Sequence, residues 1–428
     1  MRRRARRRPP RGVRNRPWRD AVINSDAVAA PRMRILFVDD EAAVLQALRR
    51  NLHGMRIEWS MDFVSSGDAA LALLAANPVD VIVSYMRMPG MDGWHLLAEV
   101  KKHFPQTARF ILSGQADPIS IMRVIGTAHQ YLAKPCDGAA LKAAIGKTLE
   151  LRRVLHSERL AGLVGQVGAL PSPPRAFQEI LACLRQPTAS IADAARIIGR
   201  DAAMTANIMK LVNSAFFGSR QPITTAERAV SCLGLNTLGV LVLGYGVFQS
   251  GASGGEDGIR LEQLWRHSLD TGLTARAVAV HAGMSAALAE QAFLVGVLHD
   301  IGRVVFATRP QPLSAEVDDV ETHHAEIGAY LLGLWGFPTP IVEAVAYHHA
   351  PSRALDAHGG ADGHGTPDAH GLNLPSLVHI ADRLVHERRG EQPDSPEHGL
   401  EPGFMAARGI EERWPQWVAA LDALEEMP

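Results

Sequence analysis

The stretch VIVSYMRMPGMDG, residues 81–93, decides the fold of the first part of this 428-residue chain. A short, mostly apolar run ends at Tyr85 and gives way to a turn with a proline and two glycines. Such a run, bounded by turn residues, is typical of a buried strand. This strand ends in the phenol of Tyr85, whereas the strand expected at 34–40 ends in the acidic pair Asp39–Asp40. The contrast raises the question of what chemistry a phenol can support beside two carboxylates.

Strand and helix patterns alternate on both sides of this stretch. Five short runs that favour strands are each followed by a helical pattern, which predicts a doubly wound α/β domain with a five-stranded parallel sheet. The expected strands lie at residues 34–40, 57–66, 79–85, 108–114 and 129–135, and the expected helices at 41–55, 68–78, 93–104, 118–127 and 138–155.

Polar residues follow four of the five expected strands. In a parallel sheet, functional side chains gather at the carboxyl ends of the strands. We therefore expect Asp39, Asp40, Tyr85, Ser113 and Lys134 to meet in one small pocket.

The rest of the chain is predicted to be helical. The helical pattern continues past Leu149 and stops at LPSPP, residues 170–174, because proline cannot continue a helix. From residue 175 onward the apolar residues recur at helical spacing, until a glycine-rich stretch interrupts them. The predicted units are a basic tail at 1–32, the α/β domain at 33–150, a linking helix at 151–169, an all-α domain at 170–388 with a flexible insertion at 351–373, and a C-terminal extension at 389–428.

Charge is distributed unevenly along the chain. The formal net charge is -1, but residues 1–32 hold eleven arginines and two aspartates, a balance of +9, so the remainder carries -10. An acidic body argues against a nucleic-acid-binding surface over most of the protein. The tail, expected to be disordered, is either an arm for nucleic acid or anionic lipid or an extension from a start site placed before Met33. The second interpretation is preferred, because Met33 directly precedes the first strand.

The three cysteines, Cys136, Cys183 and Cys232, are scattered and form no CxxC pair. This pattern suits a reducing compartment and excludes a zinc knuckle. The longest apolar run, at 238–248, has about half the length of a membrane span. We therefore expect a cytoplasmic protein with no membrane span.

The helical region contains residue types that bind divalent metal ions. An adjacent His–Asp pair, with further histidines and a distant aspartate on other helices, suits one or two ions. Such ions lower the pKa of bound water and hold a phosphoryl group. The alternative is that these buried side chains satisfy one another through hydrogen bonds. The candidate ligands are His267, His299, Asp300, His324, His348, His349 and Asp382.

The α/β region, residues 33–150, resembles the receiver domain of bacterial two-component response regulators. The resemblance rests on VDDE at 38–41, MRMPGMDG at 86–93, LSG at 112–114 and YLAKP at 131–135. It implies that Asp39 and Asp40 match the family's magnesium-binding pair, Ser113 its hydroxyl residue, Lys134 its lysine, and Tyr131 the aromatic residue whose rotation reports phosphorylation.

Tyr85 stands at the position of the family's phosphate-accepting aspartate. Tyrosine has a pKa near 10 and is neutral at pH 7, so it cannot form an acyl phosphate. It also removes a magnesium ligand, and its ring would fill the space of the phosphoryl group. We therefore expect a degenerate receiver that takes no phosphate at residue 85 and binds magnesium poorly. The alternative is that Asp39 or Asp40 serves as a substitute acceptor.

The helical region resembles the HDOD domain, a relative of the HD metal-dependent phosphohydrolases, over about residues 165–388. HDOD domains are mostly regarded as regulatory modules. The resemblance rests on LPSPP (170–174), LVNSAFFG (211–218), AVSCLGLNTLGVLVL (229–243), LWRHSL (264–269), FLVGVLHDIGR (293–303), HHAEIGAYLLGLWGFP (323–338) and IVEAVAYHH (341–349).

The resemblance implies a set of metal ligands, but the sequence also differs from the HD hydrolases of cyclic dinucleotides. The sequence has Arg303 where the cyclic-dinucleotide hydrolases have lysine, and no GYP loop follows His349, so substrate recognition differs from theirs. If the domain is an enzyme, its catalytic candidates are His299, Asp300 and Arg303, and its metal is iron, manganese or zinc. The implied ligands are His267, His299–Asp300 and Asp382, joined in two-metal relatives by His324, His348 and His349.

Together the two resemblances imply a bacterial signalling regulator. Its degenerate receiver would be coupled by the linking helix to an HDOD output domain that acts mainly through protein–protein interaction. The expected partners are a histidine kinase or other signalling proteins, a nucleotide second messenger and a second copy in a homodimer. The alternative is an HD-type phosphohydrolase acting on a nucleotide or cyclic dinucleotide. A DNA-binding regulator is excluded, because no basic helix-turn-helix is found.

Overall fold

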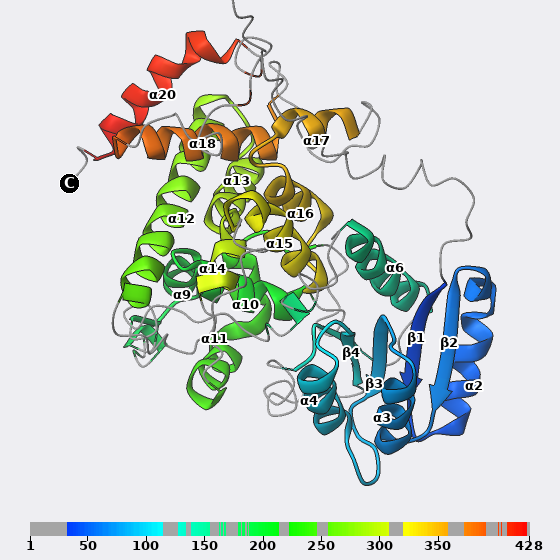
Figure 1. The fold of residues 1–428 in the computed structure, drawn as a ribbon. Coiled ribbons are helices and arrows are strands. Elements are labelled where there is room, and N and C mark those ends of the chain that lie inside the picture. Colours follow the sequence, from blue (N-terminus) through cyan, green and yellow to red (C-terminus); the bar gives the residue numbers. More distant parts are fainter. Residues whose placement is uncertain are drawn as a thin grey trace, which may run out of the picture.

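The computed structural model has an α/β half, residues 32–154, and a helical half, residues 162–425 (Figure 1). The residues that it describes are 32–113, 127–133, 138–154, 188–213, 222–245, 256–307, 320–357, 372–390 and 409–425, with short stretches between 162 and 186 and residues 401 and 404.

Five parallel strands form the sheet of the α/β half, in the order β2-β1-β3-β4-β5. Ile35, Leu36 and Phe37 of β1 are fully buried, as expected for a strand covered on both faces. The doubly wound sheet predicted from the sequence is confirmed. Its strands are β1 Met33–Val38, β2 Trp59–Val64, β3 Val81–Tyr85, β4 Ala108–Ser113 and β5 Gln130–Ala133.

Helices follow the strands largely as predicted. The helix expected at 41–55 is shorter, because α2 ends at Asn51 and a 3-10 helix, His53–Ile57, takes over. Residues 118–126 of the helix expected at 118–127 lie outside the described residues, and Thr127 lies in a turn. The described α-helices are α2 Ala42–Asn51, α3 Gly67–Ala76, α4 Gly93–His103 and α6 Gly138–Val154.

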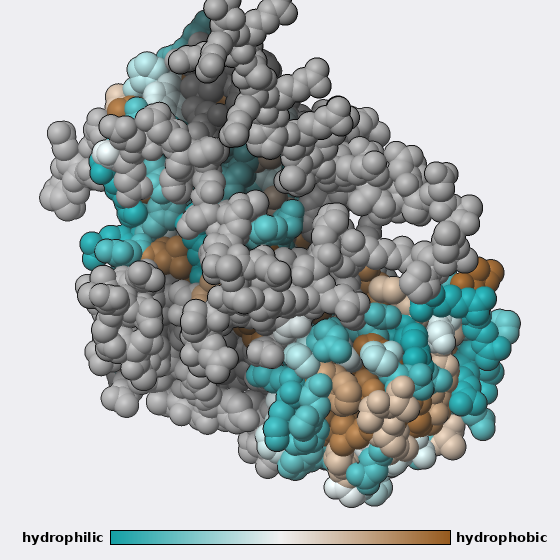
Figure 2. All heavy atoms as spheres, in the orientation of Figure 1, coloured by the Kyte–Doolittle hydropathy of each residue, from teal (hydrophilic) through white to brown (hydrophobic). Residues whose placement is uncertain are grey.

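Part of the outer surface of this half is apolar. Figure 2 shows an apolar area between hydrophilic ones, over the region where Figure 1 places α3 and α4. Helix α3 exposes the alanines Ala69, Ala72 and Ala75.

Gly93 closes the turn that follows β3. A Cβ atom at residue 93 would lie 2.0 Å from the carbonyl oxygen of Tyr85, so only glycine fits there. The N–H of Gly93 donates to the carbonyl of Met86 at 2.9 Å. The stretch quoted at the outset thus ends in glycine because the turn packs directly on the backbone of Tyr85.

The described residues of the helical half contain no strand, as the sequence predicts. Helices α12 and α13 cross closely: a Cβ atom at Gly296 would lie 2.6 Å from the Cα atom of Gly272. None of the described helices is long and apolar enough to cross a membrane. The helices are α9 Ile191–Gly199, α10 Ala202–Val212, α11 Ala226–Tyr245, α12 Glu256–His281, α13 Ala286–Leu298, α14 Ile301–Ala307, α15 Val320–Leu334, α16 Thr339–Ala346, α17 Pro351–Ala357, α18 Leu374–Arg388 and α20 Ile410–Glu425.

Two predicted segments are only partly described. The flexible insertion was expected from residue 351, but Pro351–Ala357 form α17, so its first part is helical, and residues 358–371 lie outside the described part of the chain. Proline is well tolerated in the first turn of a helix, and this favours a start at Pro351. The linking helix expected at 151–169 is described only near its two ends, so its continuity stays a prediction.

The two halves meet at the C-terminal end of α15. The side chain of Gln130, on β5, donates a 3.2 Å hydrogen bond to the carbonyl of Leu334. Lys147 of α6 donates to the carbonyl of Phe337. These contacts join the last strand and last helix of the α/β half to the turn after α15.

A buried arginine fastens the chain beyond α6 to the sheet. Arg109, on β4, is fully buried and donates from Nη2 to the carbonyl of Gly165 at 2.5 Å. Its Nε donates to the carbonyl of Thr127 at 2.6 Å. Burial lowers the pKa of Arg109 to about 9, which leaves the guanidinium charged at neutral pH.

Candidate metal centre

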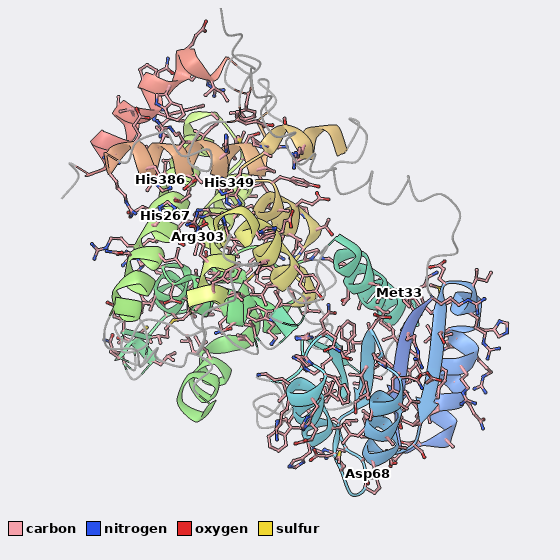
Figure 3. The ribbon with its side chains drawn as sticks, viewed as in Figure 1. Met33, Asp68, His267, Arg303, His349 and His386 are labelled. Carbon is pink, nitrogen blue, oxygen red and sulfur yellow. The ribbon has the colours of Figure 1, made fainter. Side chains whose placement is uncertain are left out.

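Side chains from separate helices meet in the interior of the helical half (Figure 3). Every candidate metal ligand named from the sequence is among them, and all except the partly buried His349 are buried. They are His267 of α12, the His299–Asp300 pair between α13 and α14, His324 of α15, His348 and His349 after α16, and Asp382 of α18.

Asp300 lies between two groups of imidazoles. Its Oδ2 atom is 3.6 Å from Nε2 of His299 and 3.8 Å from Nε2 of His267. Its Oδ1 atom is 3.3 Å from Nε2 of His324. One carboxylate therefore serves both groups, one oxygen to each.

The first ligand group consists of His267, His299, Asp382 and the Oδ2 atom of Asp300. Oδ1 of Asp382 lies 3.0 Å from Nε2 of His267 and 3.6 Å from Nε2 of His299. Nε2 of His386 is 3.3 Å from the same oxygen. Imidazole nitrogens therefore surround one buried carboxylate oxygen, a donor set that suits a divalent cation.

The second ligand group consists of His324, His348, His349 and the Oδ1 atom of Asp300. Nε2 of His324 is 3.4 Å from Nε2 of His348 and 2.9 Å from Nε2 of His349. Three imidazoles thus direct the same ring nitrogen toward one point.

Backbone carbonyls fix two of the ring orientations. Nδ1 of His299 donates to the carbonyl of Gly296 at 2.7 Å, and Nδ1 of His348 donates to the carbonyl of Val345 at 2.7 Å. Because a carbonyl only accepts, Nδ1 must carry the proton. In the neutral ring, the lone pair then lies on Nε2 and faces the ligand group, as in histidines that bind metals.

Burial and neighbouring charges set the protonation states. Burial alone would raise the pKa of Asp300, but His299 and Arg303 hold it well below its usual range. Burial and the adjacent His299 keep the pKa of His348 well below its usual value. Burial would lower the pKa of His299, yet Asp300 and Asp382 outweigh it and raise that pKa to about 9. At neutral pH Asp300 is therefore ionised and His348 is neutral, the protonation states of metal ligands.

The donor atoms fit divalent ions in both number and spacing. Those of His324, His348 and His349 lie within 4.8 Å of one another, as do those of His267, His299 and Asp300. Ligand atoms about 2.0 to 2.2 Å from one ion lie roughly 3 to 3.5 Å apart, close to the separations found here. Imidazole with carboxylate suits zinc, iron or manganese.

A glycine lets the two ligand groups approach each other. A Cβ atom at Gly302 would lie 2.0 Å from the carbonyl oxygen of His324. Helices α14 and α15 therefore touch through their backbones directly after Asp300. This contact brings His324 within reach of the Asp300 carboxylate.

Comparison with known families assigns both halves of the chain. Residues 35–146 match the response regulator receiver domain, and residues 170–351 match the HDOD domain. The chain joins a receiver domain to an HDOD domain. This pair of domains supports the role of a bacterial signal-transduction regulator.

Curated relatives resemble parts of the chain. An uncharacterized protein of Treponema pallidum is 27% identical over 205 residues, which are 44% of this chain and 39% of that protein. The hydrogenase transcriptional regulatory protein HoxA of Cupriavidus necator is 41% identical over 103 residues, 24% of this chain and 21% of that protein. The chain thus spans well under half the length of these relatives.

Two solved structures match over nearly their whole length but cover only part of this chain. The signal receiver domain of an HD domain-containing protein from Pseudomonas fluorescens is 34% identical, covers 32% of this chain and 97% of that one, and has a TM-score of 0.29. The MmoQ response regulator from Methylococcus capsulatus is 19% identical, covers 59% and 98%, and has a TM-score of 0.42.

The strand ends of the receiver share one edge of the sheet. Val38 pairs with Ser84, one residue before Tyr85, and Ser113 pairs with Ala133. Asp39 and Asp40 directly follow β1, and Lys134 directly follows β5. The side chains of Ser113 and Tyr131 and the whole of Lys134 lie outside the described part of the chain, so the complete pocket stays a prediction.

The two acidic residues of the receiver differ in their surroundings. Asp39 is buried, and its Oδ1 accepts a 3.0 Å hydrogen bond from the N–H of Glu41. Asp40 is exposed, and Tyr85 is partly buried at the end of β3.

Two histidines of α18 belong to the centre and were missed from the sequence. Nε2 of His386 is 3.3 Å from Oδ1 of Asp382, and its ring centroid is 4.7 Å from that of His267. Nδ1 of His379 donates to the carbonyl of His348 at 2.7 Å. The spacing of four residues after Asp382 was a usable signal for His386, because such residues share a helix face.

Arg303 contacts the shared carboxylate. Its Nε donates to Oδ1 of Asp300 at 3.0 Å. The arginine thus orients Asp300.

Proposed function

We propose that the HDOD domain of this chain is a metal-dependent phosphohydrolase that acts on a nucleotide or cyclic dinucleotide. The position of Asp300, with one oxygen toward each of two histidine-containing ligand groups, carries this proposal. Two divalent ions bound by the groups would lower the pKa of a bound water molecule and hold a phosphoryl group.

The chain holds its ligands in place before any ion arrives. Carbonyls of Gly296 and Val345 orient His299 and His348, and Arg303 orients Asp300. Such preorganisation reduces the rearrangement needed for binding and reaction. The charge of Arg303, whose side chain is 19% exposed, suits an anionic substrate.

We infer that the receiver regulates this domain through protein contact, without phosphorylation at residue 85. Tyr85 supplies a phenol where the family has a carboxylate, and a phenol cannot form an acyl phosphate. The receiver touches the C-terminal end of α15 at Leu334, and the same helix carries His324 ten residues earlier, about 15 Å along its axis. A partner that shifts the receiver would therefore act on the second ligand group through α15.

A second candidate function is a metal-free regulatory module, as HDOD domains are mostly regarded. The burial of the centre favours it, because Asp300 and Asp382 already have imidazoles to balance their charge. Protein–protein interaction would then be the only output of the domain.

Metal analysis of the purified, untagged protein separates the two candidates. We expect about two equivalents of iron, manganese or zinc in the wild type, and none in a His299→Ala/Asp300→Ala double variant. His281→Ala, an exposed histidine on the same helix as His267, is the control and should keep its metal. A wild type that stays free of metal after reconstitution with each ion would refute the hydrolase.

A further inference from the structure

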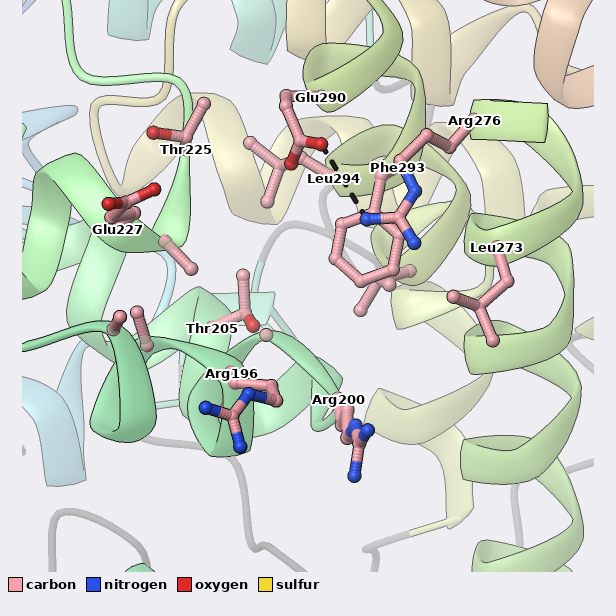
Figure 4. Close-up of a pocket in the computed structure, with 15 residues that line it drawn as sticks. Arg196, Arg200, Thr205, Thr225, Glu227, Leu273, Arg276, Glu290, Phe293 and Leu294 are labelled. Carbon is pink, nitrogen blue, oxygen red and sulfur yellow. Dashed lines mark ion pairs between the residues drawn. The ribbon is translucent and has the colours of Figure 1, made fainter. Parts of the chain in front are cut away.

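A cavity of about 460 Å³ lies in the HDOD domain, separate from the candidate metal centre. Helix α9, the start of α11 and the facing sides of α12 and α13 enclose it (Figure 4). None of the candidate metal ligands is among its lining residues. Small-molecule sites usually have about 300 to 1,000 Å³, so a single nucleotide fits this volume.

Arginines gather around the cavity. Arg196 and Arg200 lie four residues apart at the end of α9, and Arg276 lies across from them on α12 (Figure 4). Arg196 pairs with Asp193 at 2.5 Å, and Arg276 pairs with Glu290 at 3.6 Å. Among the described residues, Arg200 forms no ion pair. Its guanidinium is available to a phosphate, which it can bind through two hydrogen bonds.

An apolar surface stands opposite Arg196 and Arg200. Phe293 of α13 is partly buried, with the guanidinium of Arg276 5.3 Å from its ring centroid. Leu273 at the rim is 43% exposed, which is unusual for a large apolar side chain among the described residues. A flat ring lying on Phe293 and Leu273 would cover this surface.

The cavity also has a hydrogen-bond acceptor, the carboxylate of Glu227. Glu227, at the start of α11, lines the cavity and forms no ion pair with any described residue. A carboxylate there would accept hydrogen bonds from the N–H groups of a base, and guanine presents adjacent N–H groups on one edge.

We propose that this cavity binds a purine mononucleotide, with its phosphate at Arg196 and Arg200, its ring on Phe293, and the N–H groups of its base toward Glu227. Arg200 forms no ion pair with a described residue, so its positive charge is left for the phosphate. Helices α12 and α13, which supply two of the walls, cross closely at Gly272 and Gly296 next to the cavity. The inference does not depend on metal binding.

Titration calorimetry on the full-length protein tests the proposal, with GMP, AMP, UMP and inorganic phosphate as probes. GMP should bind most tightly. Arg200→Gln and Phe293→Leu should each weaken GMP binding about tenfold, the usual worth of a charged hydrogen bond or a stacking contact. Arg228→Gln, an exposed arginine on the first turns of α11 outside the lining, is the matched control and should bind like the wild type.

Three results would overturn the proposal. The first is the absence of GMP binding at millimolar concentration. The second is equal binding of GMP and inorganic phosphate with no effect of Phe293→Leu, which would leave an anion site only. The third is loss of GMP binding in the His299→Ala/Asp300→Ala variant, which would place the nucleotide at the metal centre instead.

Discussion

The carbonyl oxygen of Gly165 accepts a 2.5 Å hydrogen bond from Nη2 of Arg109, although the two residues lie 56 positions apart. Gly165 is also pressed against the receiver, because a Cβ atom there would lie 1.8 Å from the carbonyl oxygen of Pro105. The chain leaving the receiver is thus fastened at one glycine.

We predict that Gly165→Ala separates the two domains. The added methyl group would break the contact with Pro105 and lower the free energy of unfolding by about 1 to 3 kcal/mol. Small-angle scattering should show a larger radius of gyration. Gly146→Ala in α6 is the control, since a Cβ atom there meets nothing within 4 Å. Identical scattering of the two variants would contradict the prediction.

Gly302→Ala should disturb the metal centre without removing any ligand. Its methyl group would collide with the carbonyl of His324 and push α14 away from α15. We expect a loss of stability of about 1 to 3 kcal/mol, measured by denaturant unfolding, together with reduced metal content. If the variant kept full stability and metal, the close backbone contact would be refuted.

Mutations should distinguish the ion of the first ligand group from the ion of the second. Asp300→Asn is expected to remove both ions, because its carboxylate serves both groups. His348→Ala/His349→Ala should remove only the second ion and leave about one equivalent. Metal analysis after gel filtration measures this, with melting temperatures as a check on folding. Equal losses in both variants would speak against two separate groups.

The receiver should take no label from a small phosphodonor such as acetyl phosphate. Tyr85→Asp restores a carboxylate at the end of β3, so we expect this variant to become labelled in the presence of magnesium. An unlabelled variant would mean that more of the pocket has decayed. Label on the wild type that disappears in Asp40→Ala would show that Asp40 is the acceptor.

Acid should weaken the boundary between the two domains through His129. Burial, and then the charges of Arg109 and Lys210, hold the pKa of His129 well below its usual value. The unfolded chain takes up a proton near pH 6.5 and the folded chain does not, so unfolding becomes easier as the pH falls below 6.5.

This proton uptake can be measured from the pH dependence of stability. His129→Gln should reduce the loss of unfolding free energy between pH 6.5 and 5 by up to about 1.4 kcal/mol per pH unit. The exposed His53→Gln is the control and should keep the wild-type slope. An unchanged slope in His129→Gln would contradict the prediction.

The sheet could be predicted from the sequence because buried parallel strands are short apolar runs with polar ends, as in Val81–Tyr85. The ends of helices and strands were harder to predict from the sequence. The helical pattern continued to Met55, but α2 stops at Asn51, where the buried Leu52 turns the chain into a 3-10 helix. Helical periodicity likewise gave no indication of α17 within a glycine-rich stretch.

The residues of the candidate metal centre could be predicted only because they follow the same order along the chain as the metal ligands of the HD phosphohydrolases. Periodicity places a residue on a helix face but does not say which helices meet, so the meeting of His267 with Asp382 was expected from the family resemblance and not from the helical pattern. His379 left no signal, because it acts on the backbone of His348 and Glu401. The nucleotide cavity is formed by distant segments and was equally hidden.

The backbone contact between Gly302 and His324 also affects how such chains are sorted into enzymes and non-enzymes. Glycine is required at residue 302 by the crossing of two helices, whether or not an ion binds nearby. A descendant that lost every ligand would still need it, as it would need the buried Ile301. Within the tetrapeptide HDIG, only the first two letters carry chemical information. A classifier trained on the motif would therefore gain more from His324 and Asp382 than from its last two letters.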